Sequence, residues 1–137
     1  MRNEVRGLAL AMVLLAGPAL AQDALTGDPA AGERVFRQCM ACHAVGEGAA
    51  NKVGPELNGI MGRVPGTLEG YTFSPAMIAY GEGHVWDATT LDEYLAAPRN
   101  VVKGTKMAYP GLRKDDMRAD VIAYLAQFDD NGMAKGN

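Results

Sequence analysis

The run Cys39-Met40-Ala41-Cys42-His43 constrains this 137-residue chain more than any other feature, because it contains both of the cysteines. On a helix, Cys39, Cys42 and His43 stand at positions i, i+3 and i+4, so their side chains project from one side. C-x-x-C-H is the attachment sequence of a c-type haem, in which two thiols meet one edge of the porphyrin and the imidazole reaches the iron. The motif therefore predicts one covalently bound haem c.

Three other sites could use the same residues. A thioredoxin-like C-x-x-C is expected near a βαβ unit, and the sequence has no convincing strand alternation. A zinc site would need a fourth ligand besides Cys39, Cys42 and His43, and His84 is the only other histidine. A structural disulfide is the ordinary use of two cysteines in an exported protein, but a haem would consume both as thioethers.

The N-terminal residues have the layout of a secretory signal peptide. Two arginines precede an apolar run, and the segment ends on the small residues Ala-Leu-Ala. We expect residues 1–21 to be a cleaved signal peptide and residues 22–137 to form one periplasmic domain. The alternative is a retained membrane anchor, although an apolar run of about ten residues is short of the roughly twenty that span a bilayer.

Charge is distributed unevenly along the chain. Without residues 1–21 there are 11 basic and 15 acidic residues, a net charge of −4, which argues against nucleic-acid binding. Residues 96–114 nevertheless carry five cations and no acidic residue, namely Arg99, Lys103, Lys106, Arg113 and Lys114. Either this is a solvated loop with a chance bias, or it is a face that steers docking onto acidic partners.

Capping signals and helical spacing predict an all-α domain. A first helix is expected from Asp28-Pro29 and a second from Ser74-Pro75. A capping box of Thr90 and Glu93 predicts a third helix, which stops at Pro98. Helical spacing extends the apolar face of the first helix as far as His43 and also defines a last helix, through Met117, Val121, Tyr124, Leu125 and Phe128. The long connections 44–73 and 98–113 are expected to wrap around a large ligand.

The order and spacing of these pieces resemble the class I cytochromes c, which include mitochondrial cytochrome c and its soluble bacterial relatives in photosynthesis and respiration. Besides the haem motif, the residues that carry the resemblance are Gly32, Phe36, Gly54-Pro55-Glu56-Leu57, Gly62-Arg63, Trp86, Leu91-Asp92-Glu93-Tyr94-Leu95, Pro98, Lys103-Gly104-Thr105-Lys106-Met107 and Ile122-Ala123-Tyr124-Leu125. The resemblance implies the small cytochrome c fold, in which helices and long loops surround one covalent haem.

The resemblance also implies the ligands of the iron. His43 and Met107 would bind it from opposite sides, and the carbonyl of Pro55 would accept the other ring N–H of His43. His84 is the main alternative to Met107, although its position between Gly83 and Val85 suggests an exposed loop.

Other positions match residues that surround the haem in this family. Those near the propionates are Arg63, Trp86 and Tyr71, and those on the methionine side are Tyr94 and Thr105. The chain departs from the family at Phe73, where a propionate-bonding tyrosine is common, and at Met77, where an asparagine is frequent. Both departures make the propionate side less polar.

Iron that holds both an imidazole and a thioether has no vacant position for a substrate, so we expect an electron carrier and not an enzyme. The resemblance implies a monomer that docks transiently at membrane complexes. It would take electrons from ubiquinol–cytochrome c reductase and pass them to cytochrome c oxidase or a photosynthetic reaction centre, in a respiratory or photosynthetic chain. The alternative is a haem peroxidase or gas-binding sensor with a displaceable distal ligand.

Overall fold

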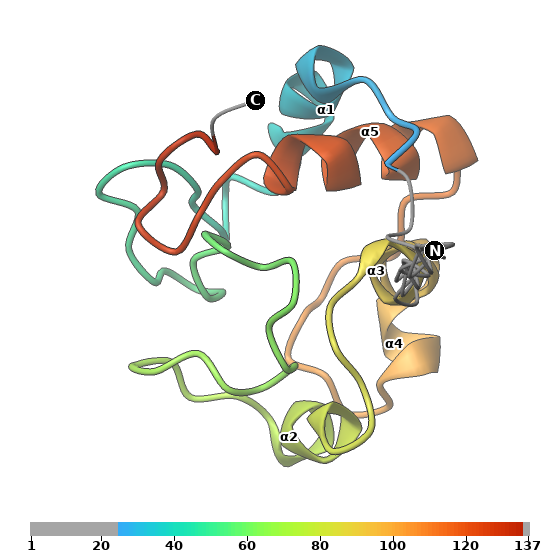
Figure 1. Cartoon of the computed structure of the whole chain (residues 1–137). Coiled ribbons are helices and arrows are strands. Elements are labelled where there is room, and N and C mark those ends of the chain that lie inside the picture. The colour runs from blue at the N-terminus through green and yellow to red at the C-terminus, as the bar shows by residue number, and fades with distance from the viewer. Residues whose placement is uncertain (1–24, 136–137) are drawn as a thin grey trace, which may run out of the picture.

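Helices joined by long loops make up the computed structural model, which describes residues 25–135 (Figure 1). In chain order they are α1 (Pro29–Phe36), α2 (Pro75–Gly81), α3 (Ala88–Ala96), α4 (Pro98–Val101) and α5 (Asp115–Leu125). Between residues 25 and 135 the only β-structure is an isolated antiparallel bridge between Phe128 and Ala134. The all-α prediction is therefore confirmed. The predicted signal peptide lies outside the described residues, and none of the helices within them is long and apolar enough to cross a membrane.

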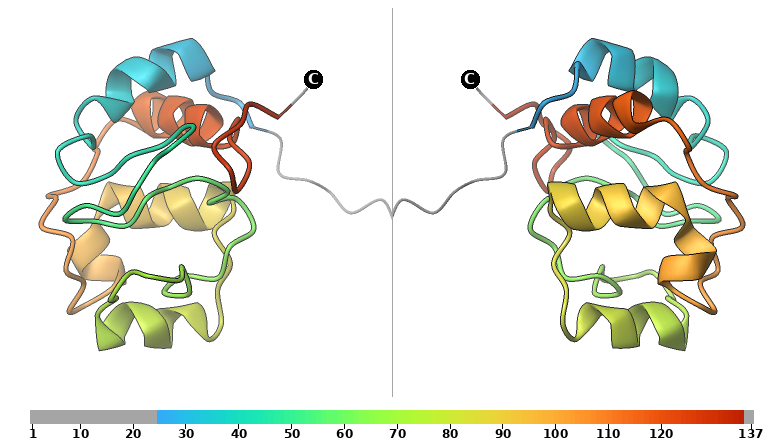
Figure 2. Two further views of the ribbon diagram at one scale, coloured as in Figure 1. Left: turned by 90° about the vertical axis from the view of Figure 1, so that its left-hand side faces the viewer. Right: turned by 90° about the vertical axis from the view of Figure 1, so that its right-hand side faces the viewer.

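The first and last helices pack together at one end of the molecule (Figures 1 and 2). Their contact depends on Gly32, because a Cβ there would lie 1.9 Å from the carbonyl oxygen of Asp120. The Phe36 and Tyr124 rings meet beside it with centroids 5.5 Å apart. The carboxylate of Asp120 also accepts a hydrogen bond of 2.7 Å from the backbone N–H of Asp28. The close backbone approach explains why a glycine is needed in the middle of a helix.

The first helix ends earlier than the spacing predicted. It stops at Phe36, and the haem motif follows in a series of turns. The N–H groups of Gln38 and Cys39 bond three residues back, which tightens the chain beyond the α-helical pitch. The N–H of His43 then bonds the carbonyl of Cys39 at 2.9 Å, so these two residues remain one helical turn apart. The expectation of one continuous helix to His43 is wrong, but the relation of Cys39 to His43 is preserved.

The start of the third helix also differs from the prediction. α3 begins at Ala88, and its N-cap is Asp87, whose carboxylate accepts a bond of 2.7 Å from the N–H of Thr90. The Thr90–Glu93 capping box is therefore wrong, since Asp87 takes the capping position three residues earlier. α3 ends just before Pro98, as predicted, and Pro98 then begins the short α4. Phe128, expected on the last helix, lies beyond its end at Leu125.

The predicted cap of the second helix is confirmed. The hydroxyl of Ser74 accepts a bond of 3.1 Å from the N–H of Met77, and Pro75 occupies the first turn of α2. α2 lies at the end of the molecule away from α1 and α5, and α3 lies between them (Figure 2). The loops 37–74 and 102–114 run between these layers and enclose the central region of the molecule.

Candidate functional site

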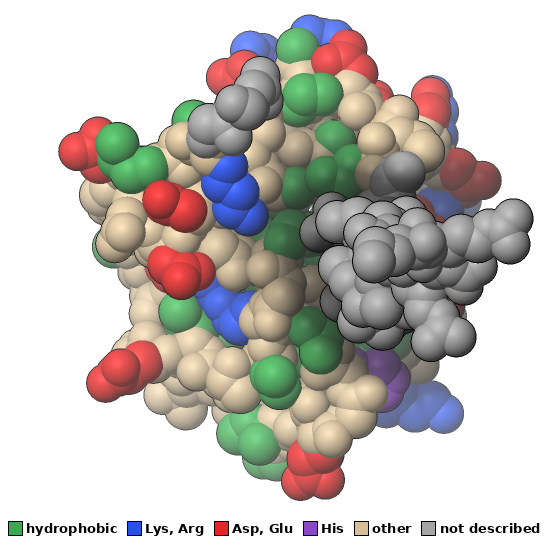
Figure 3. Space-filling model, in the orientation of Figure 1, with side chains coloured by type: hydrophobic (Ala, Val, Ile, Leu, Met, Phe, Trp, Pro, Cys, Tyr) green, Lys and Arg blue, Asp and Glu red, His purple; other side chains and the backbone are tan. Residues whose placement is uncertain are grey.

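A cavity of about 350 Å³ opens between the two long loops and the inner faces of α2, α3 and α5. Most of its lining is apolar, from side chains such as Phe36, Leu57, Ile60, Leu91 and Val121. Figure 3 shows apolar side chains in a hollow near the middle of one face of the molecule. All ten residues predicted to hold a haem line this cavity: Cys39, Cys42, His43, Pro55, Arg63, Tyr71, Trp86, Tyr94, Thr105 and Met107.

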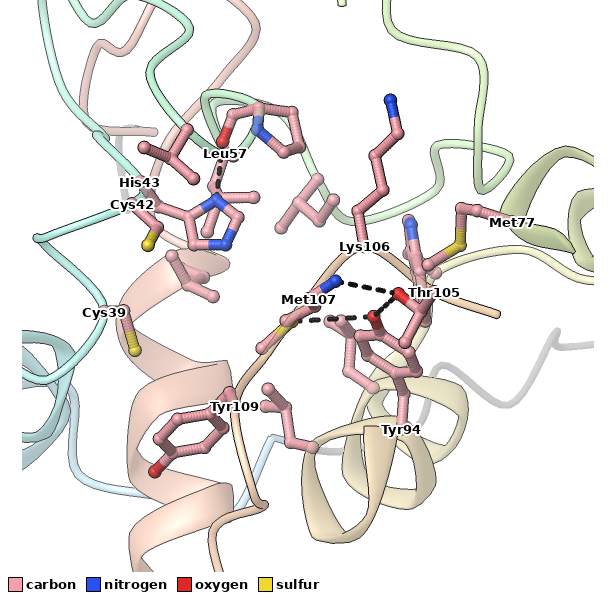
Figure 4. Close-up of a pocket in the computed structure, with 18 of the residues that line it drawn as sticks. Cys39, Cys42, His43, Leu57, Met77, Tyr94, Thr105, Lys106, Met107 and Tyr109 are labelled. Atoms are coloured by element: carbon pink, nitrogen blue, oxygen red, sulfur yellow. Dashed lines mark hydrogen bonds between the residues drawn. The ribbon is translucent and has the colours of Figure 1, made fainter. Parts of the chain in front are cut away.

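Two free thiols stand on one side of the cavity (Figure 4). Cys39 and Cys42 are joined by a turn in which the N–H of Cys42 bonds the carbonyl of Cys39 at 3.1 Å. Burial, together with the neighbouring Cys42 thiol, raises the pKa of Cys39 to about 11. The Cys39 thiol is therefore protonated at neutral pH, and the turn presents both sulfurs to the same ligand edge.

The imidazole of His43 is fixed by the loop that follows the thiols. Its Nδ1 lies 2.6 Å from the carbonyl oxygen of Pro55, so Nδ1 carries the proton and Nε2 keeps its lone pair. Gly54 makes room for the ring, because a Cβ there would lie 2.5 Å from Cε1 of His43. Burial lowers the pKa of His43, although the bond to Pro55 opposes this shift. A neutral, oriented imidazole is the state that binds a metal ion.

Met107 is held by two hydroxyl groups (Figure 4). The O–H of Tyr94 donates to Sδ of Met107 at 3.5 Å, and it also lies 3.0 Å from the hydroxyl of Thr105. The Thr105 oxygen accepts a bond of 3.3 Å from the N–H of Met107. Burial raises the pKa of Tyr94, which keeps its phenol protonated and able to donate. The geometry thus orients a thioether into the cavity.

The position of His84 argues against it as a ligand. It is absent from the cavity lining, is exposed, and has its Nδ1 2.7 Å from the backbone carbonyl of Tyr80. Its ring also stacks on Tyr80, with centroids 3.9 Å apart. A different competitor emerges from the structure, since Met77 is buried and lines the same cavity. The sequence analysis identified Met77 only as a departure from the family, and the fold reveals that its thioether shares the pocket.

The polar residues predicted near the propionates already have partners within the chain. Arg63 donates to the carbonyl oxygens of Glu56 and Asn58, and its guanidinium lies 3.9 Å from the Glu56 carboxylate. Tyr71 donates to the carbonyl of Val53 at 2.8 Å. These residues and the buried Trp86 therefore support the loop 53–63 and the cavity wall, and their contact with propionates stays a prediction.

Two supporting contacts were not foreseen from the sequence. The ammonium of Lys106 donates to the carbonyl of Thr72 at 2.6 Å, which ties the Met107 loop to the loop before α2. At the other end of the same loop, Arg118 of α5 donates to the carbonyl of Leu112 at 2.9 Å and to the carboxylate of Asp92 at 2.7 Å. The sequence does not predict these hydrogen bonds. Neither a lysine next to a methionine nor an arginine within a helix indicates which distant residue it will contact.

The donors around the cavity fit a covalently attached haem. Paired thiols on one side, an imidazole with a free Nε2, and a thioether are the groups such a cofactor uses, and the apolar walls suit a porphyrin. The zinc alternative is not supported, because no group of three His, Cys, Asp or Glu side chains within residues 25–135 is placed to hold a metal ion.

Comparison with known proteins agrees with this geometry. The cytochrome c family model matches residues 29–129. Cytochrome c-550 of Ancylobacter novellus is 50% identical over 105 residues, which cover 76% of this chain and 98% of that protein. Cytochrome c2 of Blastochloris viridis is 43% identical over 135 residues, 98% of this chain and 100% of that protein. The solved structure of cytochrome c2 from Rhodospirillum centenum superposes with a TM-score of 0.72 at 40% identity, over 75% of this chain and 99% of the other.

The match spans the cysteine pair, both long loops and the helices α1 to α5. The chain therefore belongs to the cytochrome c family, as an electron carrier rather than an enzyme, with haem c attached covalently through Cys39 and Cys42.

Proposed function

We propose that the chain is a periplasmic electron shuttle whose haem iron is bound by His43 on one side and Met107 on the other. The observation that carries this proposal is that an imidazole with a free Nε2 and an oriented thioether line one cavity. When bound, the haem supplies a one-electron Fe(III)/Fe(II) couple. If His43 and Met107 both hold the iron, no position is left for a substrate, which favours a carrier over the peroxidase or gas-sensor alternative.

The surrounding residues serve electron transfer by keeping the site rigid and dry. The bond from His43 to Pro55 fixes the imidazole, and the Tyr94–Thr105 pair fixes the thioether. The apolar lining excludes water, so little has to reorganise when the charge on the iron changes. Methionine as an axial ligand raises the reduction potential, which suits a late place in an electron-transport chain.

The test of this ligation replaces each of the two methionines in the cavity. Met107→Ala should abolish the weak methionine–iron absorption band of the ferric protein and allow the ferrous protein to bind carbon monoxide. Met77→Leu is the matched control, since it removes the other thioether that lines the cavity while keeping the apolar volume. Loss of the band in Met77→Leu but not in Met107→Ala would overturn the ligand assignment.

For partners, we propose ubiquinol–cytochrome c reductase as donor and cytochrome c oxidase or a photosynthetic reaction centre as acceptor. Relatives named cytochrome c2 support electron-transfer partners in general. All five cations of the segment 96–114 are exposed. Transient docking of a monomer through this basic segment, after export and cleavage of residues 1–21, completes the proposal.

A further inference from the structure

Aromatic rings form a continuous chain from the surface to the methionine side of the cavity. The exposed His84 stacks on Tyr80 with centroids 3.9 Å apart. Tyr80 lies 5.9 Å from Trp86, and Trp86 lies 5.1 Å from Tyr94. Tyr94 then contacts Sδ of Met107 through its hydroxyl at 3.5 Å. Each ring is thus in contact with the next, which is the arrangement that lets an electron move in short steps.

The outer end of this chain is the place where an electron is most easily lost. Trp86 and Tyr94 are buried, each 6% exposed, whereas Tyr80 is half-buried and reaches the surface. Glu93 and Asp87 act on Tyr80 closely enough to add to the increase in its pKa that burial causes. Negative charge near a phenol favours removal of an electron from it, and solvent can take the phenolic proton.

Tyr71, which lines the cavity, has the opposite electrostatic surroundings to Tyr80. The ammonium of Lys106 lies 6.0 Å from the centre of the Tyr71 ring, so loss of an electron from that ring would create a second positive charge beside it. Tyr109 lies within the basic segment 96–114, and its hydroxyl donates to Gln38 at 3.2 Å. Charge therefore disfavours oxidation at Tyr71 and favours it at Tyr80.

We propose that Tyr94, Trp86 and Tyr80 conduct oxidising equivalents out of the cavity, so that a peroxide that enters while Met107 is released from the iron ends by oxidising Tyr80 instead of Met107. For each hydrogen peroxide, the O–O bond breaks and two phenols, in two molecules of the chain, each give up one electron and one proton. The products are two waters and two tyrosyl radicals. This path would protect the thioether that the proposed function uses as a ligand, and it requires the haem but none of the proposed docking partners.

The experiment exposes the ferric holoprotein to hydrogen peroxide with a nitroso spin trap, and maps the adducts by mass spectrometry of peptides. The trap should be found on Tyr80. The variant Tyr80→Phe keeps a ring in the chain but removes the oxidisable phenol. It should show a several-fold increase in methionine sulfoxide at Met107 and in adduct on Tyr94.

Tyr109→Phe is the matched control, because it removes one phenol from the cavity lining and leaves the aromatic chain intact. It should leave the Tyr80 adduct and the Met107 sulfoxide at wild-type levels. Adducts on Tyr71 or Tyr109 with none on Tyr80, or equal sulfoxide in Tyr80→Phe and wild type, would overturn the proposal. The methionine–iron band, recorded before peroxide is added, tests the ligation separately, since neither substituted residue is a proposed ligand.

Discussion

Among single residues, Tyr94 has the most direct influence on the proposed iron ligand. Its hydroxyl donates to Sδ of Met107, and a hydrogen bond to a ligand sulfur withdraws electron density from the metal. This favours the reduced iron over the oxidised one. The Thr105 hydroxyl, 3.0 Å away, keeps the phenol in place.

Tyr94→Phe should therefore lower the reduction potential. A hydrogen bond of ~1 kcal/mol, converted for one electron, corresponds to a shift of roughly 40 mV. The potential is measured by spectroelectrochemical titration. Tyr109→Phe is the control, because the hydroxyl of Tyr109 bonds Gln38 and not the sulfur. A potential that rises in Tyr94→Phe, or falls equally in Tyr109→Phe, would contradict the role given to this bond.

Most residues of the haem site could be predicted from the sequence, because their chemistry is specific. The spacing of Cys39, Cys42 and His43 fits a haem because each group has one task that no other residue type performs. The choice between Met107 and Met77 came from the family resemblance, since a thioether can equally fill a core. Both methionines line the cavity, and the hydrogen bond from Tyr94 to Sδ of Met107 is the feature of the fold that favours Met107.

At the level of secondary structure, capping residues decide where the helices begin. Asp87 caps α3 through the N–H of Thr90, and this hydrogen bond lowers the pKa of the Asp87 carboxyl. A carboxyl whose pKa is lower in the folded state stabilises the fold above its unfolded pKa, near 3.8. That contribution is lost as the pH falls through the lower, folded pKa.

Asp87→Ala should reduce the free energy of unfolding by ~1 kcal/mol at neutral pH, as expected for loss of an N-cap. The difference in unfolding free energy between this variant and the wild type should shrink below about pH 3.8, because the Asp87 carboxyl of the wild type then becomes protonated. Denaturant unfolding at both pH values measures this. Glu93→Ala is the control and should have little effect, because Glu93 is not part of the observed cap. An equal loss of unfolding free energy in Glu93→Ala would support the Thr90–Glu93 capping box instead.

The helix boundaries that the sequence missed depend on competition between neighbouring residues. Asp87 and Thr90 are both good N-cap residues, so local preference could not choose between them. The first helix ends at Phe36 because the chain tightens there into the haem motif, a change that periodicity does not reveal. Arg118 is mostly buried within α5, and its partners Asp92 and Leu112 come from other parts of the chain.

For the whole molecule, the uneven charge is the property that governs encounters with partners. The exposed cations of the segment 96–114 flank Met107 along the chain, while the chain as a whole is acidic. The dipole that results should orient the molecule as it approaches an acidic surface. Lys106 is a poor choice for testing this, because its ammonium also bonds Thr72 and holds the loop.

Lys103→Glu should slow association with ubiquinol–cytochrome c reductase several-fold at low salt and flatten the dependence of the rate on ionic strength. Stopped-flow kinetics across a salt series measure both effects. Lys135→Glu makes the same change of charge outside the basic segment and should alter the rate much less. Equal effects of the two substitutions would show that net charge, and not the basic segment, controls docking.

The overall architecture follows from the need to enclose one large planar group in a small domain. The short helices α1 to α5 cannot form a large core by themselves, and the long loops contribute much of the cavity wall. The sequence predicted those loops as ligand-wrapping segments because they lack helical periodicity. Tertiary bonds such as Lys106 to Thr72 could not be predicted, since they join loops 34 residues apart.

X-ray absorption at the iron edge of the ferric holoprotein addresses the axial ligation most directly. We predict a first coordination shell made of the porphyrin nitrogens, one imidazole nitrogen and one sulfur, with the sulfur absent in Met107→Ala and retained in Met77→Leu. A shell without sulfur in the wild-type protein, or a sulfur that persists in Met107→Ala, would contradict the assignment of His43 and Met107 as the two ligands.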